Sequence, residues 1–262
     1  MVKGLLVSKA MIEGQEVLVI FDTGAPGLVL NKNYFTSNNQ EMVPCYGVNG
    51  NFESQTHLVS EWNWLGITHT KTTALVSDLS FLEKALNKKV YALIGLSAIE
   101  DYFITIDYDR SSISLADKIE FDKKDAVRFQ YADHLPVITC KVNGKKQTLG
   151  LDTGAEANYL FTSQPDQQEL ASAIPYLVTG TDNQQRLMHS FEMNLDLDLN
   201  KKMLSEFLID LDPSHPYDIT SFDGLLGQQF LTNYKVSIHP LRQIIVLTPR
   251  VEERAFPVAV NP

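Results

Sequence analysis

Polar and apolar residues alternate along much of this 262-residue chain, or apolar residues form short runs bounded by turn residues. The alternation is clearest at 193–200, where a period of two is typical of a half-buried strand. Broader stretches of the same kind occupy 58–76 and 191–210. The apolar runs 16–21 and 147–151 each follow a short polar break with a glycine, which predicts two hairpins.

Helical patterns are few and short by comparison. We expect helices at 79–87, 97–102, 165–174 and 228–233. Trp62 and Trp64 alternate on one expected strand, where they are predicted to pack. The dense strand signals therefore predict a mainly β fold.

The chain also repeats itself, which is the sequence sign of a duplicated structural unit. The matching pairs are Gly14–Gly144, Asp22–Asp152 and Gly50–Gly180, 130 residues apart, and Gly95–Gly227, Tyr102–Tyr234, Ile106–Ile238 and Arg110–Arg242, 132 residues apart. A nearly constant offset over four blocks predicts two copies of one unit, each of ordinary domain size. We place the units at 1–120 and 121–262, joined near the charged connector 116–127.

The composition of the chain argues against nucleic-acid binding and against a membrane-spanning protein. The chain is 44% apolar, enough to bury a sizeable core, and its formal net charge of −10 would repel nucleic acid. No apolar run is long enough for a transmembrane helix, and the first residues are too polar for the apolar core of a signal peptide. We therefore expect a soluble chain without a membrane span. Its location stays open, including a secreted or periplasmic one reached with a leader that was removed.

The chemistry concentrates at two Asp-Thr-Gly triplets, which begin at Asp22 and Asp152. Each triplet ends an apolar strand, and its glycine permits a tight turn and close backbone approach. One triplet alone is as well explained by an ordinary turn. Two at equivalent positions of a repeat can be brought together by a pseudo-twofold axis.

Two adjacent carboxyl groups cannot both ionise easily, so they share one proton over a wide pH range. The ionised group can activate a water as a general base, while the protonated group donates to a substrate carbonyl. Such a pair hydrolyses a peptide bond without a metal or a covalent intermediate. We predict no cofactor and no metal site, since the six histidines are scattered without a ligand pattern: His57, His69, His134, His189, His215 and His239.

These motifs resemble those of the aspartic peptidases. The resemblance rests on 19–25 and 149–155, which hold the triplets, and on the later apolar-apolar-glycine segments 93–95 and 225–227. It covers nearly the whole chain, and implies two acid-protease-like β-barrel lobes with a cleft between them. It also implies that Asp22 and Asp152 are catalytic.

The same resemblance implies supporting roles within the triplets. Thr23 and Thr153 would hydrogen-bond across the lobe interface, and the N–H groups of Gly24 and Gly154 would donate to the carboxylates. The triplets are followed by Ala25 and Ala155, as in retroviral enzymes, whereas pepsin-like enzymes have Ser or Thr there. The chain therefore resembles two retropepsin-like units fused into one bilobal chain. Without that hydroxyl we expect an optimum less acidic than that of pepsin, at about pH 4–6.

A flap over the cleft is expected about 28 residues after each catalytic Asp, close to the retroviral spacing. The flap candidates are Tyr46, Val48, Asn49 and Gly50 in the first unit and Thr179 and Gly180 in the second.

The sequence thus predicts an aspartic endopeptidase that binds an extended polypeptide substrate. The alternative is a catalytically weak or inactive peptide-binding protein of the same fold. We also predict a monomer, because the fused repeat supplies the twofold site within one chain.

Overall fold

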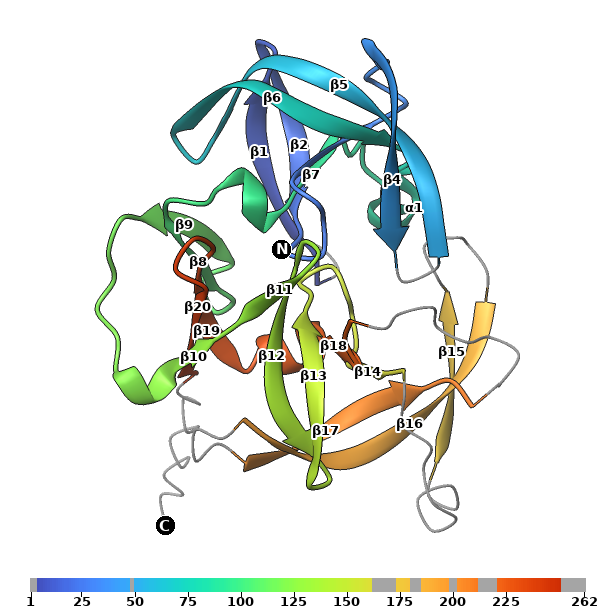
Figure 1. Ribbon diagram of the computed structural model, residues 1–262, viewed down its shortest axis with the longest axis vertical. Helices are drawn as coiled ribbons and strands as arrows, with labels where there is room; N and C mark the ends of the chain where they lie inside the picture. The colour runs from blue at the N-terminus through green and yellow to red at the C-terminus, as the bar shows by residue number, and fades with distance from the viewer. Residues whose placement is uncertain are drawn as a thin grey trace, which may run out of the picture.

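The computed structural model describes residues 4–47, 50–161, 173–179, 185–197, 202–211 and 221–250 (Figure 1). In this part of the chain the fold is mainly β, as predicted. Its helical segments are short: α1 (Ser80–Leu86), η1 (Leu96–Ala98), η2 (Lys123–Asp125) and α3 (Gln228–Leu231). None of the helices in the described ranges is both long and apolar enough to cross a membrane.

The first sheet is built from the first part of the chain and closes on itself. In order of hydrogen-bonded neighbours, its strands are β1 (Leu6–Ile12), β2 (Gln15–Phe21), β7 (Ala92–Ile94), β3 (Leu28–Asn31), β6 (Ile67–Ser77), β5 (Gly50–Trp64) and β4 (Asn39–Gly47). An additional antiparallel pairing of β1 with β5 closes six of these strands into a barrel. The predicted hairpin before Asp22 is the β1–β2 pair, which turns at Glu13 and Gly14 with positive φ angles of 49° and 80°.

A second sheet is built from the later part of the chain. Its strands are, in order, β11 (Gln130–Ala132), β12 (Leu135–Val142), β13 (Lys145–Leu151), β18 (Gly224–Leu226), β14 (Tyr159–Leu160), β17 (Lys202–Ile209), β16 (Gln185–Asp196) and β15 (Ile174–Thr179). A pairing of β12 with β16 closes this sheet in the same way. From β12 onward, the strands take the same order as those of the first sheet.

The third sheet draws strands from both parts of the chain. Its order is β10 (Ala126–Arg128), β20 (Ile244–Pro249), β19 (Tyr234–His239), β8 (Phe103–Asp107) and β9 (Ser112–Ala116). At its centre β8 and β19 run antiparallel, and the hydroxyls of Thr105 and Ser237 hydrogen-bond at 2.8 Å. This sheet joins the two halves through backbone hydrogen bonds.

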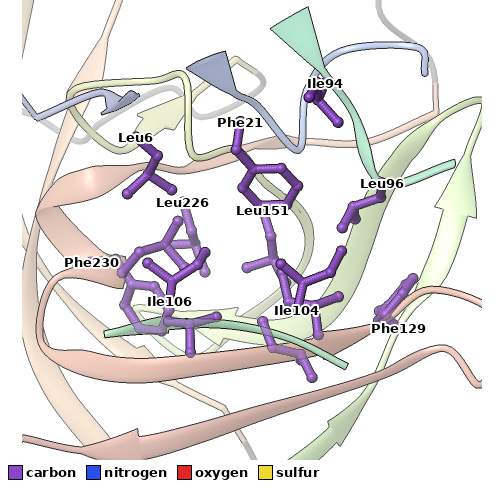
Figure 2. Packing of buried hydrophobic residues seen from close by; sticks show 14 of the residues in the cluster. Leu6, Phe21, Ile94, Leu96, Ile104, Ile106, Phe129, Leu151, Leu226 and Phe230 are labelled. Atoms are coloured by element: carbon purple, nitrogen blue, oxygen red, sulfur yellow. The ribbon is translucent and has the colours of Figure 1, made fainter. Parts of the chain in front are cut away.

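One hydrophobic cluster extends through both halves. Figure 2 shows Phe21, from the end of β2, and Leu151, from the end of β13, in this cluster with Ile104 and Ile106 of β8. The strands that lead into the two triplets are therefore anchored in shared apolar packing. Trp62 and Trp64 are 1% and 0% exposed, which confirms that they pack in the core.

The helix predictions had mixed outcomes. Those at 79–87 and 228–233 are confirmed by α1 and α3, whereas the one at 97–102 was too long. Only a 3-10 turn forms there, because the chain soon enters β8, where Phe103 is buried. Residues 165–172 of the predicted helix 165–174 lie outside the described residues. The prediction is wrong for Ile174, which begins strand β15 and pairs with β16.

Candidate active site

Asp22 and Asp152 occupy equivalent places in the two barrels, directly after β2 and β13. Each of these strands lies inside its sheet, and each pairs in parallel with a three-residue strand, β7 or β18. The ladder continues one residue further. The Asp22 N–H donates to the carbonyl of Ile94 at 2.9 Å, and the Asp152 N–H donates to that of Leu226 at 3.0 Å. Both aspartates are therefore held at the ends of interior strands.

The glycines of the triplets bring the two carboxyl groups together. The Gly24 N–H donates to Asp22 Oδ1 at 2.8 Å, and the Gly154 N–H donates to Asp152 Oδ1 at 2.7 Å. A Cβ atom on Gly24 would lie 2.9 Å from Oδ1 of Asp152, and one on Gly154 would lie 2.7 Å from Oδ2 of Asp22. Each carboxyl group therefore packs against the opposite loop, where a larger residue than glycine would collide with it.

The threonines of the triplets exchange hydrogen bonds between the halves. The Thr23 N–H donates to Thr153 Oγ1 at 3.0 Å, and the Thr153 N–H donates to Thr23 Oγ1 at 2.9 Å. The Thr23 hydroxyl donates to the carbonyl of Leu151 at 2.6 Å, and the Thr153 hydroxyl donates to that of Phe21 at 3.4 Å. The hydrogen bonds expected across the two triplets are thus present, and both threonines are almost wholly buried.

The apolar-apolar-glycine segments lie directly behind the triplet loops. The Gly95 N–H donates to the carbonyl of Gly27 at 2.7 Å, and the Gly227 N–H donates to Oδ1 of Asn158 at 3.0 Å. A Cβ atom on Gly95 would lie 2.0 Å from the carbonyl oxygen of Ala25. The glycine therefore lets the loop after Asp22 rest against the end of β7.

Burial and mutual contact make the two carboxyl groups unequal. Both residues are half-buried, and burial raises the pKa of both by disfavouring the charged form. The pKa of Asp22 is raised well above its ordinary value, because the charge of Asp152 and a hydrogen bond to that carboxylate add to the effect of burial. For Asp152, the N–H of Gly154, the hydrogen bond from Asp22 and the N–H of Ala155 oppose the rise. The contact therefore favours one shared proton over two ionised carboxyl groups, and it raises the pKa of Asp22 further than that of Asp152.

His134 is a site residue that sequence reasoning missed. It occupies the tight turn between β11 and β12 with Asp133, whose φ of 54° is positive. Its Nε2 lies 2.8 Å from the carbonyl oxygen of Gly24, across 110 residues of chain. Ala132 and Leu135 on either side of the turn are buried. The sequence signal that could have revealed His134 is a difference between the two repeats, because the residue 130 positions earlier is Gly4.

Sequence reasoning also missed Gln228, whose counterpart in the first repeat likewise differs from it. It is buried at the start of α3, and its Nε2 donates to the carbonyl of Thr153 at 2.5 Å. The equivalent residue in the first unit, 132 positions earlier, is Leu96, which has no amide to donate. The two triplet loops therefore have different polar supports.

The described flap candidates lie at the turn ends of two hairpins. Tyr46 is near the end of β4 and Gly50 begins β5, and Thr179 ends β15. In the view of Figure 1 the end of β4 and the start of β5 point downward, and the end of β15 and the start of β16 lie below them. Val48, Asn49 and Gly180 lie outside the described residues. The flap role of all six stays a prediction.

Within the described ranges, no group of three or more His, Cys, Asp and Glu side chains is arranged to hold a metal ion. In comparisons with known proteins, no family model and no curated protein matches the chain.

Proposed function

We propose that the protein is an aspartic endopeptidase with a bilobal arrangement of two retropepsin-like units. The observation that carries the proposal is the close approach of the Asp22 and Asp152 carboxyl groups, each packed against the opposite triplet loop, between two loops cross-linked by Thr23 and Thr153. The common strand order of the two barrels supports a pseudo-twofold axis through this pair, with a cleft between the lobes.

The proposed reaction follows from the unequal carboxyl groups. The Asp152 carboxylate removes a proton from a water molecule, which attacks the carbonyl carbon of the scissile peptide. The Asp22 carboxyl donates its proton to the carbonyl oxygen. As the tetrahedral intermediate collapses, the C–N bond breaks, the nitrogen takes the proton now held by Asp152, and one hydroxyl of the intermediate returns its proton to Asp22, so that an acid and an amine leave. The pair then returns to its singly protonated state.

The substrate class is an extended polypeptide. An extended chain can hydrogen-bond to the ends of strands through its backbone while alternate side chains enter pockets. The hairpins β4–β5 and β15–β16 are the strands we assign to this role. The likeness to aspartic peptidases leads us to expect apolar residues on either side of the cleaved bond.

The decisive experiment compares the wild-type chain with Asp22→Asn and Asp152→Asn on a peptide library between pH 3 and 7. Asparagine keeps the Oδ1 acceptor for the Gly24 or Gly154 N–H and removes the titrating carboxyl. We expect each variant to lose cleavage by at least about a thousandfold, because neither the base nor the acid can be replaced by the other. A statine-type inhibitor should block the wild type.

Asp117→Asn is the matched control, since Asp117 is exposed and outside the site. It should cleave at the wild-type rate. Normal cleavage by either triplet variant would overturn the mechanism. Inhibitor binding without any cleavage by the wild type would favour the peptide-binding alternative.

A further inference from the structure

His134 makes the duplicated site asymmetric. Its turn is held by a small apolar cluster that contains Ala132, Leu135 and Leu225, against which Ala155 packs. The turn thus belongs to the half that carries Asp152. The imidazole, however, reaches the carbonyl of Gly24 in the other half. It therefore links the β11–β12 turn of the second half to the first triplet loop.

The Gly24 carbonyl is a sensitive place for such a bridge. The N–H of the same residue donates to Asp22, and its Cα is so close to Asp152 that a Cβ atom would lie 2.9 Å from Oδ1. A side chain that holds Gly24 therefore also sets how closely the first loop approaches Asp152. The equivalent position of the other half is Gly4, which has no side chain to do the same.

The imidazole also acts electrostatically on the second carboxylate. Burial holds the pKa of His134 below its ordinary value, although the Gly24 carbonyl, Asp133 on its own turn and Asp152 on the loop after β13 each act to raise it. Among the described residues, these two aspartates are the charged groups that act on the ring. In return, a protonated His134 favours the ionised form of Asp152. The acidic range in which we expect catalysis is also the range in which an imidazole becomes charged.

We propose that His134 is a positioning residue that assigns the role of general base to Asp152, because from one half of the duplicated site it holds Gly24, which lies against that carboxylate. This inference rests on the proposed function and deepens it. It assigns the general base to one half of a duplicated site, which two identical triplets alone could not do.

The test separates the hydrogen bond from the charge. His134→Gln retains an N–H donor for the Gly24 carbonyl but has no charge, and His134→Leu has neither. Without the cation, Asp152 is protonated at a higher pH, so the acidic limb of the kcat/KM profile should move upward by about 0.5 pH unit in both variants. His134→Gln should keep kcat at its optimum within about threefold, whereas His134→Leu should lose about tenfold because Gly24 is no longer held.

His57→Gln is the matched control, because a ring nitrogen of His57 likewise contacts a backbone carbonyl, that of Thr36, at 2.7 Å. Its profile should coincide with that of the wild type. An acidic limb of His134→Gln that stays within about 0.1 unit of the wild type would overturn the inference, as would an equal shift in His57→Gln.

A second measurement works without catalysis. The carboxyl carbons of labelled aspartate can be titrated by NMR in the full chain, with Asp152→Asn to assign them. The lower pKa of the pair should belong to Asp152 and should rise in His134→Gln. If the wild type does not cleave but this pKa rises, the proposed function fails and the inference stands. If it cleaves and this pKa does not rise, the inference alone fails.

Discussion

Thr23 and Thr153 occupy equivalent positions but make hydrogen bonds of different length. The Thr23 hydroxyl donates over 2.6 Å to Leu151, whereas the equivalent donation from Thr153 to Phe21 spans 3.4 Å. Both hydroxyls also accept an N–H from the other threonine. The shorter pair of contacts should stabilise the folded chain more.

We therefore expect Thr23→Val to lower the free energy of unfolding by about 2–4 kcal/mol, and Thr153→Val by about 1–2 kcal/mol. Valine keeps the shape of threonine but leaves buried backbone groups unsatisfied. Denaturant unfolding measures both values. Thr23→Ser, which retains the hydroxyl, should lower the free energy of unfolding less than Thr23→Val does. Equal losses of stability in Thr23→Ser and Thr23→Val would refute the hydrogen-bond account.

At the scale of elements, β7 is the strand that places the loop after Asp22. Its last residue, Ile94, accepts the Asp22 N–H, and Gly95 then lies against Ala25. The sequence marks this segment as an apolar pair before glycine. The structure supplies the reason for the glycine, which is the absence of room for a Cβ atom.

Gly95→Ala should therefore displace the Asp22 loop. We expect a loss of about 2–3 kcal/mol in the free energy of unfolding and at least a tenfold loss in kcat/KM, because the carboxyl pair would be misaligned. Gly14→Ala is the control: no atom lies within 4 Å of its Cβ position, and only its φ of 80° opposes the change. It should cost about 1 kcal/mol and leave cleavage unchanged. Equal effects on cleavage would show that β7 does not position the loop.

At the scale of the whole molecule, the third sheet and the shared core join the two halves, so we expect them to unfold as one cooperative unit. Both tryptophans lie in β5, so their fluorescence reports on the first half, while far-UV circular dichroism reports on both. Ile238 in β19 is 1% exposed and pairs with Ile104 of β8. A substitution that destabilises the second half should therefore also lower the stability of the first half.

We expect Ile238→Ala to lower the unfolding free energy by about 3 kcal/mol, with the same midpoint by both probes. Leu241→Ala, at a residue that is 65% exposed, should change it by less than about 0.5 kcal/mol. A tryptophan transition that stays at the wild-type midpoint would mean that the halves unfold independently.

Local pattern was enough to predict the mainly β class, the hairpins before each triplet, the burial of Trp62 and Trp64, and the equivalence of Asp22 and Asp152. These features follow from the period of the strands and from the repeat, both of which are written along the chain. The 3-10 turn after Gly95 and the start of β15 at Ile174 were not predicted, because packing and strand pairing override short helical patterns. Tertiary structure alone decided that Thr23 makes shorter hydrogen bonds than Thr153, that His134 and Gln228 support opposite loops, and that the pKa of Asp22 is raised further than that of Asp152. Those differences arise from contacts between residues far apart in the sequence, where the two copies of the repeat have diverged, and a local pattern carries no information about such contacts.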